Sequence, residues 1–259
     1  MQFWKDSQKT QPGNAKTATR IMYTSTSFKG EKVAVTGAAL TSQKPWKGEG
    51  QRPVVVVAPG TQGLGDPCAP SNQLEAGTEY EFLAINPLLD AGYNVIVTDY
   101  LGSGTAGTHS YLNRVDQGNA VLDAARAAFA SELGMGDATS PVGIWGYSQG
   151  GGAAASAAEL QPSYAPELNL KGVYAGAVPA DLESVVNKID GTLYNGFMLM
   201  GLVGLGDSYG IDYSQYLNAE GMGMVQKVRE VCTGGAIEEF GKVKDSGVWT
   251  KNGEKIPTL

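Results

Sequence analysis

Four nearly continuous runs of apolar residues constrain the fold of this chain most. They are "RPVVVVAPG", "NVIVTDY", "PVGIWGY" and "LKGVYAGAV", and each is bounded by glycine, proline or polar residues. Helix-like segments separate them, among them "GTEYEFLAINPLLDAG", "RVDQGNAVLDAARAAFASELG" and "GGGAAASAAELQ". Strands that are apolar on both faces and alternate with helices indicate a parallel sheet covered on both sides. The sequence therefore predicts an α/β fold with a mostly parallel sheet.

Two earlier runs and one later region complete the predicted organisation. "TRIMYTSTSF" and "KVAVTGAALT" lie close together and alternate in polarity, as an antiparallel pair at the edge of the sheet would. From Asp181 to about Trp249 no strand-like run occurs, and glycine, methionine, leucine and tyrosine dominate. The 259 residues suit one large domain with an insertion. We expect an α/β core over 1–180, an inserted helical subdomain over 181–250, and a return to the core over 251–259.

The stretch "WGYSQGG" places Ser148 in the pattern G-x-S-x-G, after an apolar strand and before an alanine-rich helix. A sharp strand-to-helix turn strains the serine backbone, and small residues on either side relieve the clashes. The serine then lies at the amino end of a helix, where negative charge is favoured. The context predicts a catalytic nucleophile; the alternative is a structural glycine-rich turn.

Acyl transfer also needs hydrogen-bond donors aimed at the oxygen that becomes negative in the transition state. The backbone N–H of Gln149, directly after Ser148, is the first candidate. The glycine-rich loop "APGTQGLGDPCAPS" follows a buried strand and offers the second, on Thr61 or Gln62. The alternative is that this loop is a plain connection.

His109 is the single histidine of the chain, and it precedes Ser148. In α/β-hydrolases the order is serine, acid, histidine, so we expect His109 to have a structural or site-lining role rather than that of the base. The nearby "GSGTAG" matches a dinucleotide-binding pattern, but the residues after it do not open a helix at once. We interpret it as a loop that lines the site.

Charge and cysteine content exclude several classes of function. A net charge of -7 argues against binding to nucleic acid or to an anionic membrane surface. Cys68 and Cys232 have no zinc-site spacing, and no cofactor or metal is predicted; they are two free thiols or one long-range disulfide. The polar start "MQFWKDSQKT" is neither a signal peptide nor a membrane span.

Within the helical region, one set of residues recurs at helical spacing: Tyr194, Phe197, Met198, Gly201, Leu202 and Leu205. A buried helix packed on the sheet would explain this stripe. A lid or acyl-binding wall would explain it equally well, because flexible methionines and hinge glycines suit such an element. In that case Phe197, Met198 and Leu202 are expected to line the apolar entrance to the site.

Several motifs together resemble the secretory lipase family: the serine turn, "APGTQGLGDPCAPS", "DYLGSGTAGTHSYLN" followed by "GNAVLDAARAA", and the helical region with Cys232. The resemblance implies a secreted, extracellular α/β-hydrolase with a helical lid that cleaves esters of acylglycerols at the lipid–water interface. It implies Ser148 as nucleophile, Gln149 and Thr61 as oxyanion donors, and a disulfide between Cys68 and Cys232.

In this family the catalytic aspartate and histidine follow the lid, whereas this chain ends at "GEKIPTL". We therefore expect both residues on a C-terminal segment of the same protein, which as a partner fragment would complete the triad. Two alternatives stay open. One is a cutinase-like esterase, although cutinases lack a large lid. The other is a catalytically silent binding protein with the α/β-hydrolase fold.

Overall fold

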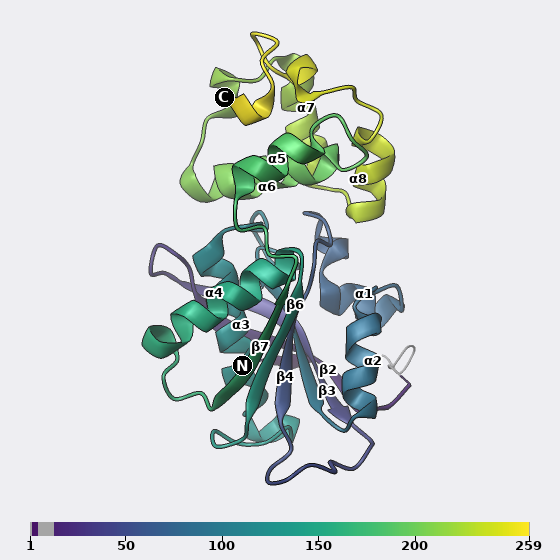
Figure 1. The fold of residues 1–259 in the computed structure, drawn as a ribbon, viewed down its shortest axis with the longest axis vertical. Coiled ribbons are helices and arrows are strands. Elements are labelled where there is room, and N and C mark those ends of the chain that lie inside the picture. The colour runs from purple at the N-terminus through teal and green to yellow at the C-terminus, as the bar shows by residue number, and fades with distance from the viewer. Residues whose placement is uncertain (1, 5–12, 259) are drawn as a thin grey trace.

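The computed structural model describes residues 2–4 and 13–258, and its centre is a seven-stranded sheet (Figure 1). The strands are β1 (Gln2–Trp4), β2 (Ala15–Thr26), β3 (Lys32–Ser42), β4 (Val54–Ala58), β5 (Asn94–Leu101), β6 (Val142–Tyr147) and β7 (Leu170–Gly176). Their order in the sheet is β1-β2-β3-β5-β4-β6-β7. The pairs from β1 to β5 are antiparallel, and those from β5 to β7 are parallel. The predicted parallel sheet with an antiparallel N-terminal edge is confirmed.

Helices cover both faces of this sheet. They are α1 (Pro70–Ala76), α2 (Phe82–Asp90), α3 (Arg114–Ala128) and α4 (Gln149–Tyr164). Figure 1 shows α3 and α4 on one side of the sheet, and α1 and α2 on the other. The sequence prediction missed α1, a helix of 7 residues that starts at a proline. Proline is favoured in the first helical turn because its missing N–H would have no partner there.

The central strands are buried on both faces because successive side chains point to opposite sides. In β4, Val54 and Val56 belong to the core under α3 and α4, whereas Val57 belongs to the core under α1 and α2. In β5, Ile96 lies in the first core and Val97 in the second. The continuous apolar runs in the sequence thus follow from packing on two sides.

Four more helices follow β7, namely α5 (Leu182–Ile189), α6 (Asn195–Tyr209), α7 (Ala219–Val228) and α8 (Thr233–Phe240). Figure 1 shows them as a separate layer beyond the ends of β6 and β7, the ends at which parallel sheets build their sites. These helices have a core of their own, which includes Met198, Leu199, Val203, Val225, Phe240 and Trp249. Among the described residues, no strand follows Gly176.

The last described residues stay beside these helices. A short 3-10 helix spans Ile256–Thr258, and Ile256 packs against the helical core. The division of the chain into 1–180, 181–250 and 251–259 therefore stays a prediction. Within the described ranges, each helix is too short or too polar to cross a bilayer.

Candidate active site

Ser148 lies in the turn between β6 and α4 and has a strained backbone. Its φ of 58° and ψ of -121° fall outside the regions that residues with a side chain adopt readily. The Ser148 N–H donates to the carbonyl of Gly176 on the neighbouring strand, at 3.0 Å. Such strain persists only where the surroundings enforce it, and it is concentrated at functional sites. The turn leaves the Ser148 side chain exposed at the edge of the sheet.

The glycines around Ser148 are required by close approaches of the backbone. A Cβ on Gly146 would lie 2.1 Å from the carbonyl oxygen of Gly150. A Cβ on Gly150 would lie 1.9 Å from the Ala58 oxygen, and one on Gly151 would lie 2.1 Å from the Gly176 oxygen. The G-x-S-x-G spacing is therefore a packing requirement of a turn pressed against β4 and β7.

Two backbone N–H groups are free near Ser148. The Gln149 N–H is in the first turn of α4, where N–H groups have no partner within the helix. The Thr61 N–H donates to no other described residue, although the Thr61 side chain bonds the Tyr111 hydroxyl at 2.8 Å. Ser148, Thr61 and Gln149 line the same cavity. The N–H groups of Thr61 and Gln149 are therefore candidates for the two oxyanion donors expected from the sequence.

His109 is committed to other partners. Its ring is 3% exposed, its Nδ1 donates to the Leu101 carbonyl at 3.0 Å, and its Nε2 accepts from the Gln149 side-chain amide at 3.0 Å. Burial lowers the pKa of His109 to about 4, so the imidazole is neutral at pH 7. The Ser148 hydroxyl has no hydrogen-bond partner among the described residues. This geometry supports a structural role for His109.

A cavity of about 690 Å³ opens beside Ser148, and most of its walls are apolar side chains of α5 and α6. Phe197, Met198 and Leu202 all line it. Met198 is 2% exposed and also packs in the core of the helical layer. Helix α6 therefore contributes to both the core of the helical layer and the cavity wall. The two interpretations of its apolar residues, a buried helix and an acyl-binding wall, are compatible.

A disulfide and several hydrogen bonds attach the helical layer to the loops around the cavity. Cys68 and Cys232 form a disulfide across 164 residues of sequence. Gly63, in the same loop as Thr61, forms an isolated β-bridge with Cys232. In the loop after β5, the Thr108 hydroxyl donates to Asp207 on α6 at 2.6 Å and accepts from Arg229 at 2.9 Å. The disulfide and the β-bridge thus hold the loop after β4 against the helical layer.

The profile of the secretory lipase family matches residues 69–259. The chain belongs to the secretory lipase family. Among its relatives, a Mycobacterium tuberculosis protein named "Probable inactive lipase" is 31% identical over 232 residues, which are 85% of this chain and 51% of that protein. A secreted triacylglycerol lipase of Malassezia globosa is 32% identical over 191 residues, 70% of this chain and 39% of the relative. This secretory lipase chain thus spans about half the length of its curated relatives, or less.

Solved structures show the same fold. Candida antarctica lipase A in its closed state aligns with a TM-score of 0.75 at 22% identity, over 90% of this chain and 55% of that one. A rice cell wall degrading esterase from Xanthomonas oryzae aligns with a TM-score of 0.69 at 20% identity, over 91% and 65%. The fold of this secretory lipase is therefore the predicted α/β-hydrolase fold.

One expectation about the surroundings of the site needs revision, and two buried residues near it were not expected. The loop over 102–107 does not line the cavity of this secretory lipase; Gly107 faces a separate pocket beside Arg229, and Tyr111 and Leu112 line the cavity instead. Glu79 and Glu81, which were not predicted as site residues, are 2% and 4% exposed and bond the loop that holds Thr61. Acidic residues before a helix are ordinary, so the sequence carries no signal for this role.

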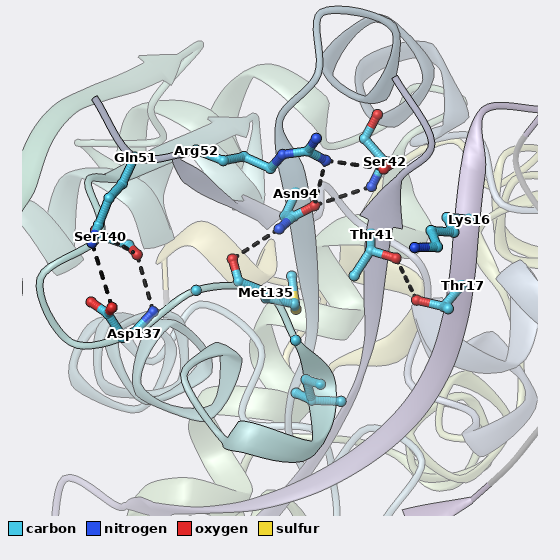
Figure 2. A pocket seen from close by; sticks show the side chains of 13 residues that line it. Lys16, Thr17, Thr41, Ser42, Gln51, Arg52, Asn94, Met135, Asp137 and Ser140 are labelled. Atoms are coloured by element: carbon cyan, nitrogen blue, oxygen red, sulfur yellow. Dashed lines mark hydrogen bonds between the residues drawn. The ribbon is translucent and has the colours of Figure 1, made fainter. Parts of the chain in front are cut away.

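A second pocket, of about 560 Å³, lies at the opposite, amino ends of the parallel strands (Figure 2). Figure 2 shows hydrogen bonds among several of its polar groups. Arg52 donates to the Ser42 carbonyl at 3.0 Å, and the Asn94 amide donates to the Met135 carbonyl at 2.8 Å. These bonds connect the chain segments that meet at the amino ends of the parallel strands in this secretory lipase.

Proposed function

We propose that this secretory lipase hydrolyses carboxylic esters with long acyl chains, acylglycerols among them, through an acyl-enzyme on Ser148. One observation carries the proposal: Ser148, an exposed serine with a strained backbone, lines an apolar cavity together with Thr61 and Gln149, whose backbone N–H groups have no partner among the described residues. Ser148 would attack the ester carbonyl, and the N–H groups of Gln149 and Thr61 would stabilise the oxyanion. The long apolar wall would hold the acyl chain.

The base is proposed to come from outside this chain. His109 uses both ring nitrogens, and a serine without a base is a weak nucleophile. We propose that a histidine and an aspartate of the same protein, on a segment beyond these residues, complete the triad. The outer edge of β7 supports this idea, because β7 ends the sheet and its residues Tyr174 and Ala175 are exposed. An unpaired strand edge readily accepts a further strand.

The helical layer is proposed to act as the lid and to meet lipid. Its cavity-lining side chains Val185, Tyr194, Tyr209 and Ile211 are also exposed to solvent. An exposed apolar patch around a cavity mouth is typical of an interaction site, here the lipid–water interface. The names of the relatives and the disulfide support a secreted, extracellular location, since disulfides persist in oxidising compartments.

One relative favours a second candidate function. The Mycobacterium tuberculosis relative is named as inactive, and in this chain the Ser148 hydroxyl has no base within the described residues. A protein that binds lipid esters without cleaving them is therefore the competing proposal. The cutinase-like alternative loses support, because the family match extends through the helices that follow β7.

The test is a series of p-nitrophenyl esters, from acetate to palmitate, with the natural full-length protein. Each buried methylene is worth about 0.8 kcal/mol, so kcat/KM should rise up to about fourfold per methylene until the cavity is filled. A maximum at acetate would contradict the long-chain proposal. Saturable binding of the palmitate ester without hydrolysis would overturn the enzyme proposal in favour of the binding protein.

A further inference from the structure

The loop that carries Thr61 is bonded by two buried carboxyl groups that the mechanism does not otherwise use. We infer that Glu81 and Glu79 are positioning residues of the oxyanion hole, which hold the backbone over 60–62 so that the Thr61 N–H faces the reacting oxygen. The inference rests on the proposed ester hydrolysis at Ser148.

Glu81 holds the residue directly before Thr61. Its Oε1 accepts a hydrogen bond from the Gly60 N–H at 2.7 Å, and the side chain is 4% exposed. The Gly60 backbone is also closely packed, since a Cβ there would lie 2.6 Å from the Tyr80 hydroxyl. A short hydrogen bond to a buried carboxyl is among the stronger kinds of hydrogen bond. Glu81 therefore fixes where the chain enters the turn at Thr61.

Glu79 holds the residue directly after Thr61. Its Oε1 accepts from the Gln62 side-chain amide at 2.9 Å and from the Glu81 N–H at 2.9 Å. The Gln62 carbonyl accepts in turn from the Thr233 N–H at 2.9 Å. The Oε1 atom of Glu79 thus connects Gln62, directly after Thr61, to the backbone of Glu81.

The remaining polar groups of Thr61 are also occupied. Its carbonyl accepts from the Tyr80 hydroxyl at 3.1 Å and from the Thr233 hydroxyl at 2.8 Å. Its own hydroxyl bonds Tyr111. Only the N–H has no partner among the described residues, and Thr61 and Ser148 together line two cavities. A donor held in this way needs no reorganisation when charge develops on the substrate, which is how such sites accelerate acyl transfer.

The two carboxyls are unusual because no salt bridge joins either of them to Lys or Arg among the described residues. The charged groups that face Glu79 are Glu81 and Asp99, both acidic. Burial raises the pKa of Glu79 to about 7 and raises that of Glu81 as well. Buried carboxyls without a cationic partner lower the stability of the fold. A more precise placement of the Thr61 N–H would explain why these two are kept next to the loop.

The test compares Glu81→Leu with Glu81→Gln in the natural full-length protein. Gln keeps an oxygen that can accept from the Gly60 N–H, whereas Leu removes it. We expect Glu81→Leu to lower kcat 10- to 100-fold with KM changed less than about twofold, because an oxyanion contact is made only in the transition state. Glu81→Gln should retain kcat within about threefold. If Glu81→Leu does not fold, Glu81→Asp is used in its place. The aspartate side chain is one methylene shorter, so its carboxyl lies farther from the Gly60 N–H. We expect this variant to lose about tenfold in kcat.

Asp123→Leu is the matched control. Asp123 is also buried, but it bonds Arg126 and Tyr164. Tyr164 is the last residue of α4, a helix of 16 residues, and lies at the opposite end of that helix from Ser148. This variant should lose stability and keep kcat. Equal kcat losses in the control and in the Glu81 variants would overturn the inference, as would an unchanged kcat in Glu81→Leu and Glu81→Asp. A wild-type protein whose Ser148 reacts with no ester would instead contradict the proposed function itself.

Discussion

The imidazole Nε2 of His109 accepts a hydrogen bond of 3.0 Å from the side-chain amide of Gln149, the residue that follows Ser148. The opposite ring nitrogen donates to the Leu101 carbonyl, so both nitrogens are used within the protein. His109 therefore fixes the residue that supplies one proposed oxyanion donor. It has no lone pair left to take the proton of Ser148.

The first prediction concerns His109→Asn, in which the amide can still donate to Leu101. We expect kcat to fall less than tenfold, because only the support of the Gln149 side chain is lost. Removing a catalytic base or nucleophile costs at least about a thousandfold. Steady-state kinetics of His109→Asn beside Ser148→Ala in the full-length protein distinguishes the two roles. Equal losses in the two variants would identify His109 as the base.

A second prediction concerns two neighbouring glycines of α4. Gly150→Ala should abolish activity and lower the melting temperature, because its Cβ would lie 1.9 Å from the Ala58 carbonyl oxygen. Gly152→Ala should be tolerated, since its closest contact is a Pro179 side-chain atom at 3.4 Å. Alanine within a helix should even stabilise the protein by about 0.5–1 kcal/mol. Calorimetry and an ester assay on both variants provide the check; similar behaviour of the two would contradict the packing argument.

A third prediction concerns the pH dependence of stability at Glu79. Its folded pKa of about 7 lies above the ordinary value of 4.5, so the folded state holds this proton more tightly. The resulting stabilisation is fully present below pH 4.5 and is lost as the pH rises through 7. Glu79→Gln removes this titration. The free energy of unfolding of the wild type, relative to the variant, should therefore fall by up to about 3 kcal/mol between pH 4 and pH 8.

Urea unfolding of both proteins at several pH values measures this difference. The titration of His109 is present in both proteins and cancels in the comparison. A difference in unfolding free energy that stays constant with pH would show that Glu79 has an ordinary pKa in the folded protein.

A fourth prediction concerns the wall of the large cavity. Phe197→Ser and Leu202→Ser should depress kcat/KM for long-chain p-nitrophenyl esters far more than for the acetate, because both side chains line the cavity and are only partly buried. Leu193→Ser is the control, since Leu193 is 59% exposed and does not line this cavity. Equal losses on short and long esters would mean that Phe197 and Leu202 support the fold and not the acyl chain.

Much of the fold could be predicted from single segments of the sequence, because the signals are local. Val54–Ala58 is entirely apolar since both faces of β4 are covered, and Ser148 is surrounded by glycines since its turn touches β4 and β7. The contacts that hold the loop with Thr61 in place join residues that are far apart in the sequence. Glu81 reaches Gly60 only after the chain has folded back through α1, and no pattern over 60–81 indicates that contact.

His109 lies between these cases. Chain order indicated that it is not the base, but its partner Gln149, 40 residues away, could not be foreseen. That bond depends on how the loop after β5 packs against the start of α4. The path of the chain after β7 is also a matter of tertiary contacts, since Ile256 packs among the helices and not on the sheet.

The most direct test of the central claim is labelling with a fluorophosphonate ester, which reacts with activated serines, followed by peptide mass spectrometry of the full-length protein. We predict one adduct per molecule, on Ser148, and neither adduct nor ester hydrolysis in Ser148→Ala. The strained backbone and the free N–H groups at the start of α4 are the reasons. An adduct on a different serine, or undiminished hydrolysis by Ser148→Ala, would contradict the account.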